Sequence, residues 1–131
     1  MSKKEAVFPG EQKDWTASYS PAVLASPRRM LFISGQVAFD DEGNVVGKGD
    51  IVAQARKIFE SLRAILNKAG GDLKDIVKTN YYITDVSQFP KVAALRSEYF
   101  SGVFPASTMV EVSGLVHEDL MLEVEAIAVL E

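Results

Sequence analysis

Apolar residues recur at helical spacing in two segments of the chain. In the longer segment they fall on one face of a helix of about five turns: Val52, Ala55, Phe59, Leu62, Ile65 or Leu66, and Ala69. The Asp50 side chain is expected to accept hydrogen bonds from the first amides of this helix. Gly70-Gly71 is expected to end it.

The second helical segment is shorter and has Pro90 in its expected first turn, where proline is well tolerated. Asp85 or Ser87 is the expected cap. Its buried stripe ends near Gly102 and consists of Val92, Leu95, Tyr99 and Phe100.

Apolar runs or strict alternation predict strands at 30–34, 76–84, 107–113 and 120–130. The first strand is expected to extend to Phe39, turn at residues 40–44 and return as a hairpin at 45–46. Residues 1–29 contain the breakers Pro9-Gly10, Ser20-Pro21 and Ser26-Pro27. They are expected to be mostly irregular, with one short strand around 22–24.

The order strand, strand, helix, strand, helix, strand, strand favours an α+β fold, in which a mixed β-sheet carries two helices on one face. The length suits a single domain over residues 1–131. The other sheet face would lack cover, although it includes Tyr, Ile and Val as well as Glu. Burial against copies of the same chain would stabilise that face, so a homo-oligomer with sites at subunit seams is expected.

The last predicted strand places two carboxylates among apolar residues. Leu122, Val124, Ala126 and Ala128 alternate onto one face, so Glu123 and Glu125 share the opposite face. A half-buried carboxylate is a candidate acid or base. The alternative is that both are ordinary solvated charges on a sheet face that meets water.

Composition narrows the possible chemistry. The 14 basic and 18 acidic residues give a net charge of -4, which argues against a nucleic-acid partner. The absence of cysteine excludes disulfides and thiolate chemistry, and the single histidine, His117, lies in an expected surface turn. Asp40 to Asn44 lack the ligand spacing of a calcium loop. No window reaches the length of a membrane span, so a cytoplasmic location and no membrane contact are expected.

A series of short motifs runs from about residue 19 to the end: Ser34-Gly35-Gln36, Gln54-Ala55, Ile76 to Thr79, Asp85, Phe89, and Pro105-Ala106 through Ala128. In order and spacing they resemble the YjgF-like family of reactive-intermediate imine deaminases, also labelled endoribonuclease L-PSP. The resemblance implies a chorismate-mutase-like α+β fold and a homotrimer with ligand clefts between subunits. It also implies hydrolysis of imines and enamines, such as 2-aminoacrylate, to a 2-keto acid and ammonia without cofactor or metal.

The resemblance also implies roles for particular residues. In these enzymes an arginine directly after Pro-Ala binds the substrate carboxylate, and a glutamate in the last strand orients the attacking water. Glu123 retains the glutamate, whereas Ser107 replaces the arginine and Met109 a common cysteine. A hydroxyl offers one neutral hydrogen bond in place of a charged fork, so the substrate is expected to differ from 2-aminoacrylate.

Other candidate pocket positions are open to two interpretations. Ser34, Gly35 and Gln36 resemble a pocket wall, but they also suit a strand-end turn. Thr108 could bind a ligand beside Ser107 or serve as ordinary turn chemistry.

Two other pocket positions also differ from the family. Ala93 stands where the family often has Asn, and Ala22 aligns near a common Tyr. Together with Ser107 in place of the arginine, they predict a roomier, less cationic pocket. Arg28 and Arg29 could supply a substitute cation across a subunit seam.

Three functions follow from these observations. The first is a deaminase of small reactive imines or enamines, in which Glu123 positions water and no cofactor is used. The second is a trimer that binds a small metabolite without turnover, because the arginine is lost. The third is an endoribonuclease or translation inhibitor, which the acidic composition disfavours.

Overall fold

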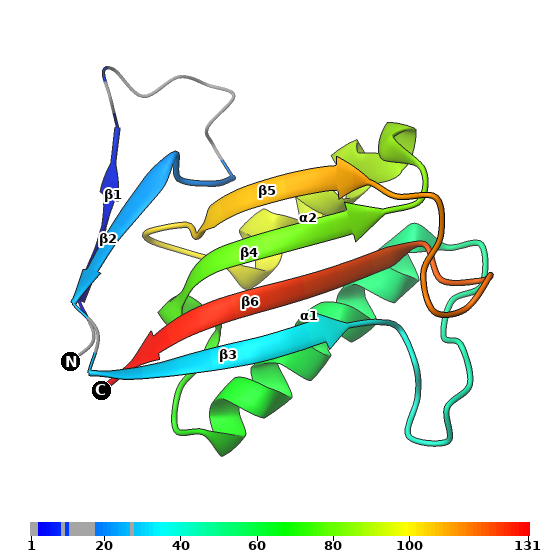
Figure 1. The fold of residues 1–131 in the computed structure, drawn as a ribbon, viewed down its shortest axis with the longest axis horizontal. Coiled ribbons are helices and arrows are strands. Elements are labelled where there is room, and N and C mark those ends of the chain that lie inside the picture. Colours follow the sequence, from blue (N-terminus) through cyan, green and yellow to red (C-terminus); the bar gives the residue numbers. More distant parts are fainter. Residues whose placement is uncertain (1–2, 9, 11–17, 27) are drawn as a thin grey trace.

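The computed structural model describes residues 3–8, 10, 18–26 and 28–131, in which two β-sheets and two α-helices form the fold (Figure 1). The elements are, in chain order, β1 (Lys3–Val7), β2 (Ala22–Ser26), β3 (Arg29–Gln36), α1 (Ile51–Lys68), β4 (Ile76–Ile83), α2 (Phe89–Tyr99), β5 (Ala106–Glu111) and β6 (Leu122–Leu130). Short 3-10 helices, η2 (Leu73–Asp75) and η3 (Val86–Gln88), precede β4 and α2.

The larger sheet is mixed and has the strand order β3-β6-β4-β5. β6 is antiparallel to both neighbours, whereas β4 and β5 are parallel. Parallel neighbours need a crossover connection, which α2 provides between β4 and β5. Because side chains alternate between the faces of a strand, this register decides which candidate residues can meet.

Both α-helices cover the same face of the larger sheet, and the opposite face carries no helix (Figure 1). Along β6, Leu122, Val124 and Ala126 are buried in the core, while the residues between them are only half-buried. From α1, Phe59 and Leu62 are fully buried in the same core. The predicted α+β fold, with two helices on one face of a mixed sheet, is therefore confirmed.

The helix ends agree with the sequence in part. Asp50 caps α1, and its Oδ1 accepts from the Ala53 amide at 3.1 Å. Gly70, with φ of 92°, follows the helix in a conformation that favours glycine. Asp85 caps η3 rather than α2, because its side chain accepts from the Ser87 amide at 3.0 Å. Pro90 lies in the first turn of α2, as predicted.

The N-terminal region differs from the prediction. Residues 3–7 form β1, which pairs antiparallel with β2 in a separate two-stranded sheet, where irregular chain was expected. The expected short strand is present as β2. The breakers Pro9 and Pro27 lie outside the described residues. The expected hairpin at 37–46 is present as a single bridge between Phe39 and Val45. The Asp40 side chain holds its turn by accepting from the Glu42 and Asn44 amides.

Gln54 connects the helix layer to the loop that precedes β6. The side chain lies on α1 and is fully buried. Its Nε2 donates to the carbonyls of Gly47 at 3.2 Å and Asp119 at 2.9 Å, and its Oε1 accepts from the Met121 amide at 2.8 Å. A buried side-chain amide that both donates and accepts hydrogen bonds fixes the position of the backbone groups it contacts. Gln54 thereby helps to set where β6, with Glu123, begins.

Candidate functional site

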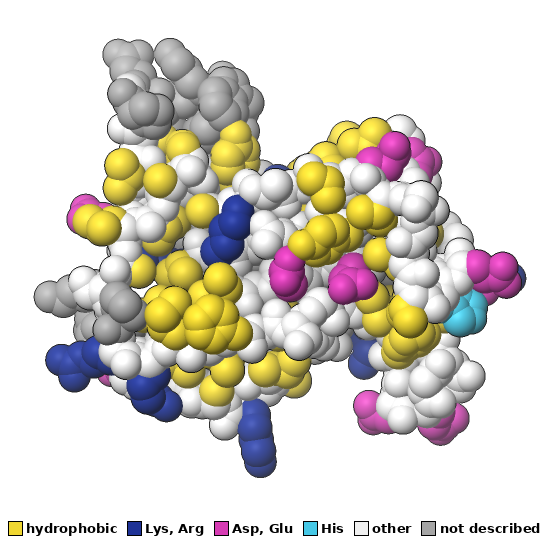
Figure 2. Space-filling model, in the orientation of Figure 1, with side chains coloured by type: hydrophobic (Ala, Val, Ile, Leu, Met, Phe, Trp, Pro, Cys, Tyr) yellow, Lys and Arg dark blue, Asp and Glu magenta, His cyan; other side chains and the backbone are white. Residues whose placement is uncertain are grey.

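The carboxylates of β6 lie on the sheet face that the helices leave uncovered. Figure 2 shows acidic and basic side chains among apolar ones on this face. Glu123 lies opposite Tyr82 on β4, and Glu125 lies opposite Asn80. Both carboxylates are half-buried rather than fully solvated, as the alternation of β6 predicts.

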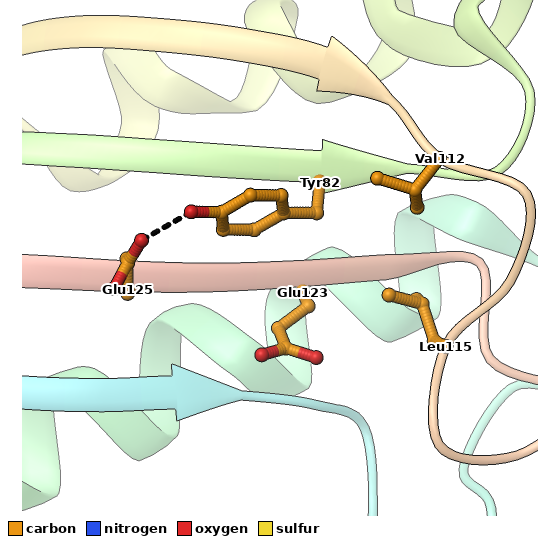
Figure 3. A pocket seen from close by; sticks show the side chains of 5 residues that line it. All are labelled: Tyr82, Val112, Leu115, Glu123 and Glu125. Atoms are coloured by element: carbon orange, nitrogen blue, oxygen red, sulfur yellow. Dashed lines mark hydrogen bonds between the residues drawn. The ribbon is translucent and has the colours of Figure 1, made fainter.

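Glu125 is held by its neighbours on β4. The Tyr82 hydroxyl donates a hydrogen bond to Glu125 Oε1 (Figure 3). Asn80 Nδ2 donates to the same oxygen at 3.2 Å. The bond to Glu125, then partial burial and the nearby carboxylate charges, raises the pKa of the Tyr82 phenol above its usual value. Glu125 is therefore tied to β4 by two hydrogen bonds.

Glu123 is different, since it makes no hydrogen bond to any of the described residues. It lines a pocket of about 240 Å³ together with Tyr82, Val112, Leu115 and Glu125 (Figure 3). Its carboxylate keeps its lone pairs free in a partly apolar hollow. Such a carboxylate can accept a proton from a water molecule.

Gly35 at the end of β3 lies against this carboxylate. A Cβ atom at position 35 would come within 1.9 Å of Glu123 Oε2. The glycine is therefore required for the observed position of the Glu123 side chain. Beside it, Gln36 Nε2 donates to the Ser34 backbone carbonyl at 3.0 Å. Residues 34–36 belong to β3, where its register with β6 shifts between Ile33 and Gln36.

A second group of candidates lies at the opposite edge of the sheet, on β5. Ser107 lies opposite the buried Thr79 and so points toward the helices, whereas Thr108 points to the uncovered face. Thr108 Oγ1 accepts from Lys78 Nζ at 2.9 Å. Ser107 Oγ accepts from a guanidinium nitrogen of Arg96 at 3.3 Å.

Six of the seven candidates thus fall into two groups within one chain. Glu123 and Ser34 to Gln36 lie on β6 and β3, and Ser107 and Thr108 lie on β5. Ala93 lies on α2, where it is half-buried. Strand β4 separates the two groups, and Ser107 faces the other side of the sheet from Glu123.

Arg96 was not among the candidates predicted from the sequence. It was overlooked because the apolar stripe of α2 was traced through Val92, Leu95 and Tyr99. An arginine four residues after Val92 and three before Tyr99 lies on the same helical face, which was the available signal. The less cationic pocket expected from Ser107 has to be revised, because Arg96 places a cation beside that hydroxyl.

The remaining charged or polar residues considered from the sequence do not line the Glu123 pocket. Glu111 accepts from the Val86 amide at 2.9 Å. His117 is exposed, and its Nδ1 accepts from the Asp119 amide at 3.0 Å within a turn. Arg29 Nε donates to the Glu131 carbonyl at 2.6 Å, and Arg28 is exposed.

The described residues hold no group of three or more potential metal ligands of the His, Cys, Asp and Glu types. Among the helices of the same residues, none has the length and apolar character needed to cross a membrane.

Fold and site together define an α+β protein with a half-buried carboxylate at a pocket on the uncovered face of its larger sheet. The chain belongs to the endoribonuclease L-PSP family, also called YjgF, RutC or Rid, whose family model matches residues 11–130. The resemblance found in the sequence is thereby confirmed.

Individual relatives match over nearly their whole length. A RutC family protein of Pyrococcus abyssi is 38% identical over 125 residues, which cover 95% of this chain and 96% of the relative. The 3-aminoacrylate deaminase RutC of Acinetobacter baylyi is 34% identical over 125 residues, covering 95% and 97%. A solved structure of a Rid family protein of unknown function from Yersinia pestis has a TM-score of 0.87 at 28% identity, and the match covers 97% of this chain and 98% of that one.

The contact between Gly35 and Glu123 yields a testable prediction. In Gly35→Ala the Glu123 carboxylate must move, and any activity that depends on it should fall at least about tenfold, because small misplacements of reacting groups are costly. Stability should change by less than about 1 kcal/mol, since only the end of a flexible side chain shifts. Turnover and denaturant unfolding measure the two effects.

Gly114→Ala is the matched control, because nothing lies within 4 Å of a Cβ at that position. Equal activity losses in the two variants, or full activity in Gly35→Ala, would contradict the assigned contact.

Proposed function

We propose that the chain hydrolyses small imines or enamines to a carbonyl compound and ammonia. The observation that carries the proposal is the half-buried Glu123 carboxylate, which lines a pocket and makes no hydrogen bond to any of the described residues. Support also comes from the relative in Acinetobacter baylyi, which is named a 3-aminoacrylate deaminase.

The proposed reaction needs only a positioned base and water. An enamine first tautomerises to its imine, whose carbon is electrophilic. Glu123 accepts a proton from water as the oxygen attacks that carbon and passes it to the imine nitrogen, which gives a tetrahedral carbinolamine. The Glu123 carboxylate then takes the proton of the carbinolamine hydroxyl and delivers it to the amino group. The carbon–nitrogen bond breaks as the carbonyl forms, and ammonia leaves behind the ketone or keto acid. The net change is addition of one water and loss of one ammonia.

The proposed site is completed by a second copy of the chain, within a homotrimer. Two observations support this. The Glu123 group and the Ser107 group lie on opposite sides of β4, so one chain does not bring them together. In addition, the uncovered face exposes large apolar side chains, with Phe32 68% and Val110 44% exposed. Burial of that face against another copy would remove this surface from water.

The catalytic proposal predicts a loss in Glu123→Gln, which keeps the shape of the side chain and removes the base. The native chain should release ammonia and keto acid from imines generated in situ by an amino-acid oxidase. Glu123→Gln should be at least about 100-fold slower, the usual contribution of a positioned base. Coupled assays for ammonia and for the keto acid measure this.

Glu111→Gln is the control, since Glu111 lies on β5 and its carboxylate accepts from the Val86 amide, a bond that glutamine can also accept. Its rate should stay within about twofold of native. Native protein that accelerates none of the imines, or Glu123→Gln that keeps the native rate, would refute the proposed function.

The homotrimer predicts that a charge on the uncovered face breaks the assembly. Phe32→Glu should sediment as a smaller species than the native trimer, because the seam would bury an unpaired carboxylate. Sedimentation velocity measures the masses. Val116→Glu, in the exposed loop before β6, should remain trimeric. A monomeric native chain, or a trimeric Phe32→Glu, would speak against the assembly.

A further inference from the structure

Arg96 is the buried cation closest to the candidate residues of β5. It lies on α2 and is 6% exposed. Its guanidinium stacks over the rings of Phe89 at 5.0 Å and Tyr81 at 5.4 Å. One terminal nitrogen donates to Ser107 Oγ at 3.3 Å, and the other donates to Ser18 Oγ at 3.0 Å. Hydrogen bonds at both terminal nitrogens and aromatic rings stacked on the guanidinium plane thus hold the group in place.

The charge of Arg96 is not balanced by an acidic side chain of the described residues. Its two polar partners are neutral hydroxyls, and its buried Nε has no hydrogen-bond acceptor in the same part of the chain. Buried charges in proteins are normally paired, because an isolated one is costly. By contrast, the exposed Arg56 has Glu98 at 3.3 Å. Among the described residues, Arg96 therefore lacks the anion with which a buried cation is normally paired.

From this geometry we infer that Arg96, with Ser107, binds the carboxylate of a small 2-keto or 2-imino acid. Ser107 Oγ accepts from the guanidinium, so its own hydroxyl proton is free to donate outward. Ser107 is half-buried, between the surface and the buried cation. A carboxylate at Ser107 accepts this proton and lies within the field of the guanidinium, in a setting where charge is poorly screened.

The inference deepens the proposed deaminase function and rests on it for the reaction. It restores a cation at the carboxylate end of the site although residue 107 is a serine. The substrate class therefore narrows to imines that carry a carboxylate, rather than imines that lack one. Arg96 and Ser107 orient the ligand, and Glu123 of a neighbouring copy acts on its imine carbon.

Binding of pyruvate, compared with its uncharged amide pyruvamide, tests the inference without any turnover. Calorimetric titration of the full chain at fixed ionic strength should give a native preference for pyruvate of at least about tenfold, the usual strength of a charged hydrogen bond. Arg96→Met should lose that preference while its affinity for pyruvamide is kept. Ser107→Ala should reduce the preference in part.

Two further variants keep the test decisive. Arg56→Met removes an exposed arginine of α1 and should bind both compounds like the native chain. If Arg96→Met does not fold, Arg96→Lys replaces it, and the loss of the planar fork should still weaken pyruvate binding severalfold.

A native chain that does not prefer pyruvate to pyruvamide would overturn the inference, as would an Arg96→Met variant that keeps the preference. Glu11 and Asp14 lie outside the described residues, so Glu11→Gln and Asp14→Asn are included. If either lowers thermal stability as Arg96→Met does, and the double variant adds no further loss, Arg96 has a partner within the chain and the inference fails.

The two proposals fail in different ways. Arg96-dependent binding of pyruvate without imine hydrolysis would leave this inference standing and refute the deaminase. Conversely, Glu123-dependent hydrolysis of uncharged imines, without any preference for carboxylates, would support the deaminase and refute this inference.

Discussion

The one-sided cover of the larger sheet is the constraint on which the rest of the structure depends. Because α1 and α2 pack on a single face, every residue of β6 belongs either to the core or to the uncovered face, by its position alone. Leu122 and Val124 go inward, so Glu123 must go outward. A shift of one residue in register would bury the carboxylate among the core side chains and expose the leucine. The same rule turns Ser107 toward the helices and the neighbouring Thr108 away from them.

The sequence was sufficient to predict α1, β4, β6 and the uncovered face, because each rests on a local periodicity that many residues repeat. It was insufficient for β1, since Lys3 to Val7 carry little apolar pattern and their partner β2 lies some way along the chain. The candidate site was predicted in the same uneven way. Alternation placed Glu123 and Glu125 together on one face, and the family resemblance singled out Glu123. The contact of Arg96 with Ser107, by contrast, joins a helix to a strand that only the folded chain brings together.

Arg96 and Glu123 illustrate two ways in which this fold holds charge. Glu125 Oε1 accepts from Tyr82 and Asn80, whereas Glu123, two residues earlier on the same strand, has no such partner among the described residues. Arg96 is enclosed by rings and hydroxyls, with no carboxylate from that part of the chain. Neither Glu123 nor Arg96 thus has an oppositely charged partner among the described residues. One can take a proton and the other can hold an anion, which together suit hydrolysis of an imino acid.

The central claim is that these two groups act on one ligand from neighbouring copies. Mixed oligomers, assembled by unfolding and refolding equal amounts of Glu123→Gln and Arg96→Met together, test it most directly. Each variant alone should hydrolyse imino acids well below the native rate. In a random mixture about one quarter of the seams combine the two intact groups, so about one quarter of the native imine hydrolysis should return. Activity no greater than that of the separate variants would contradict a site shared between copies.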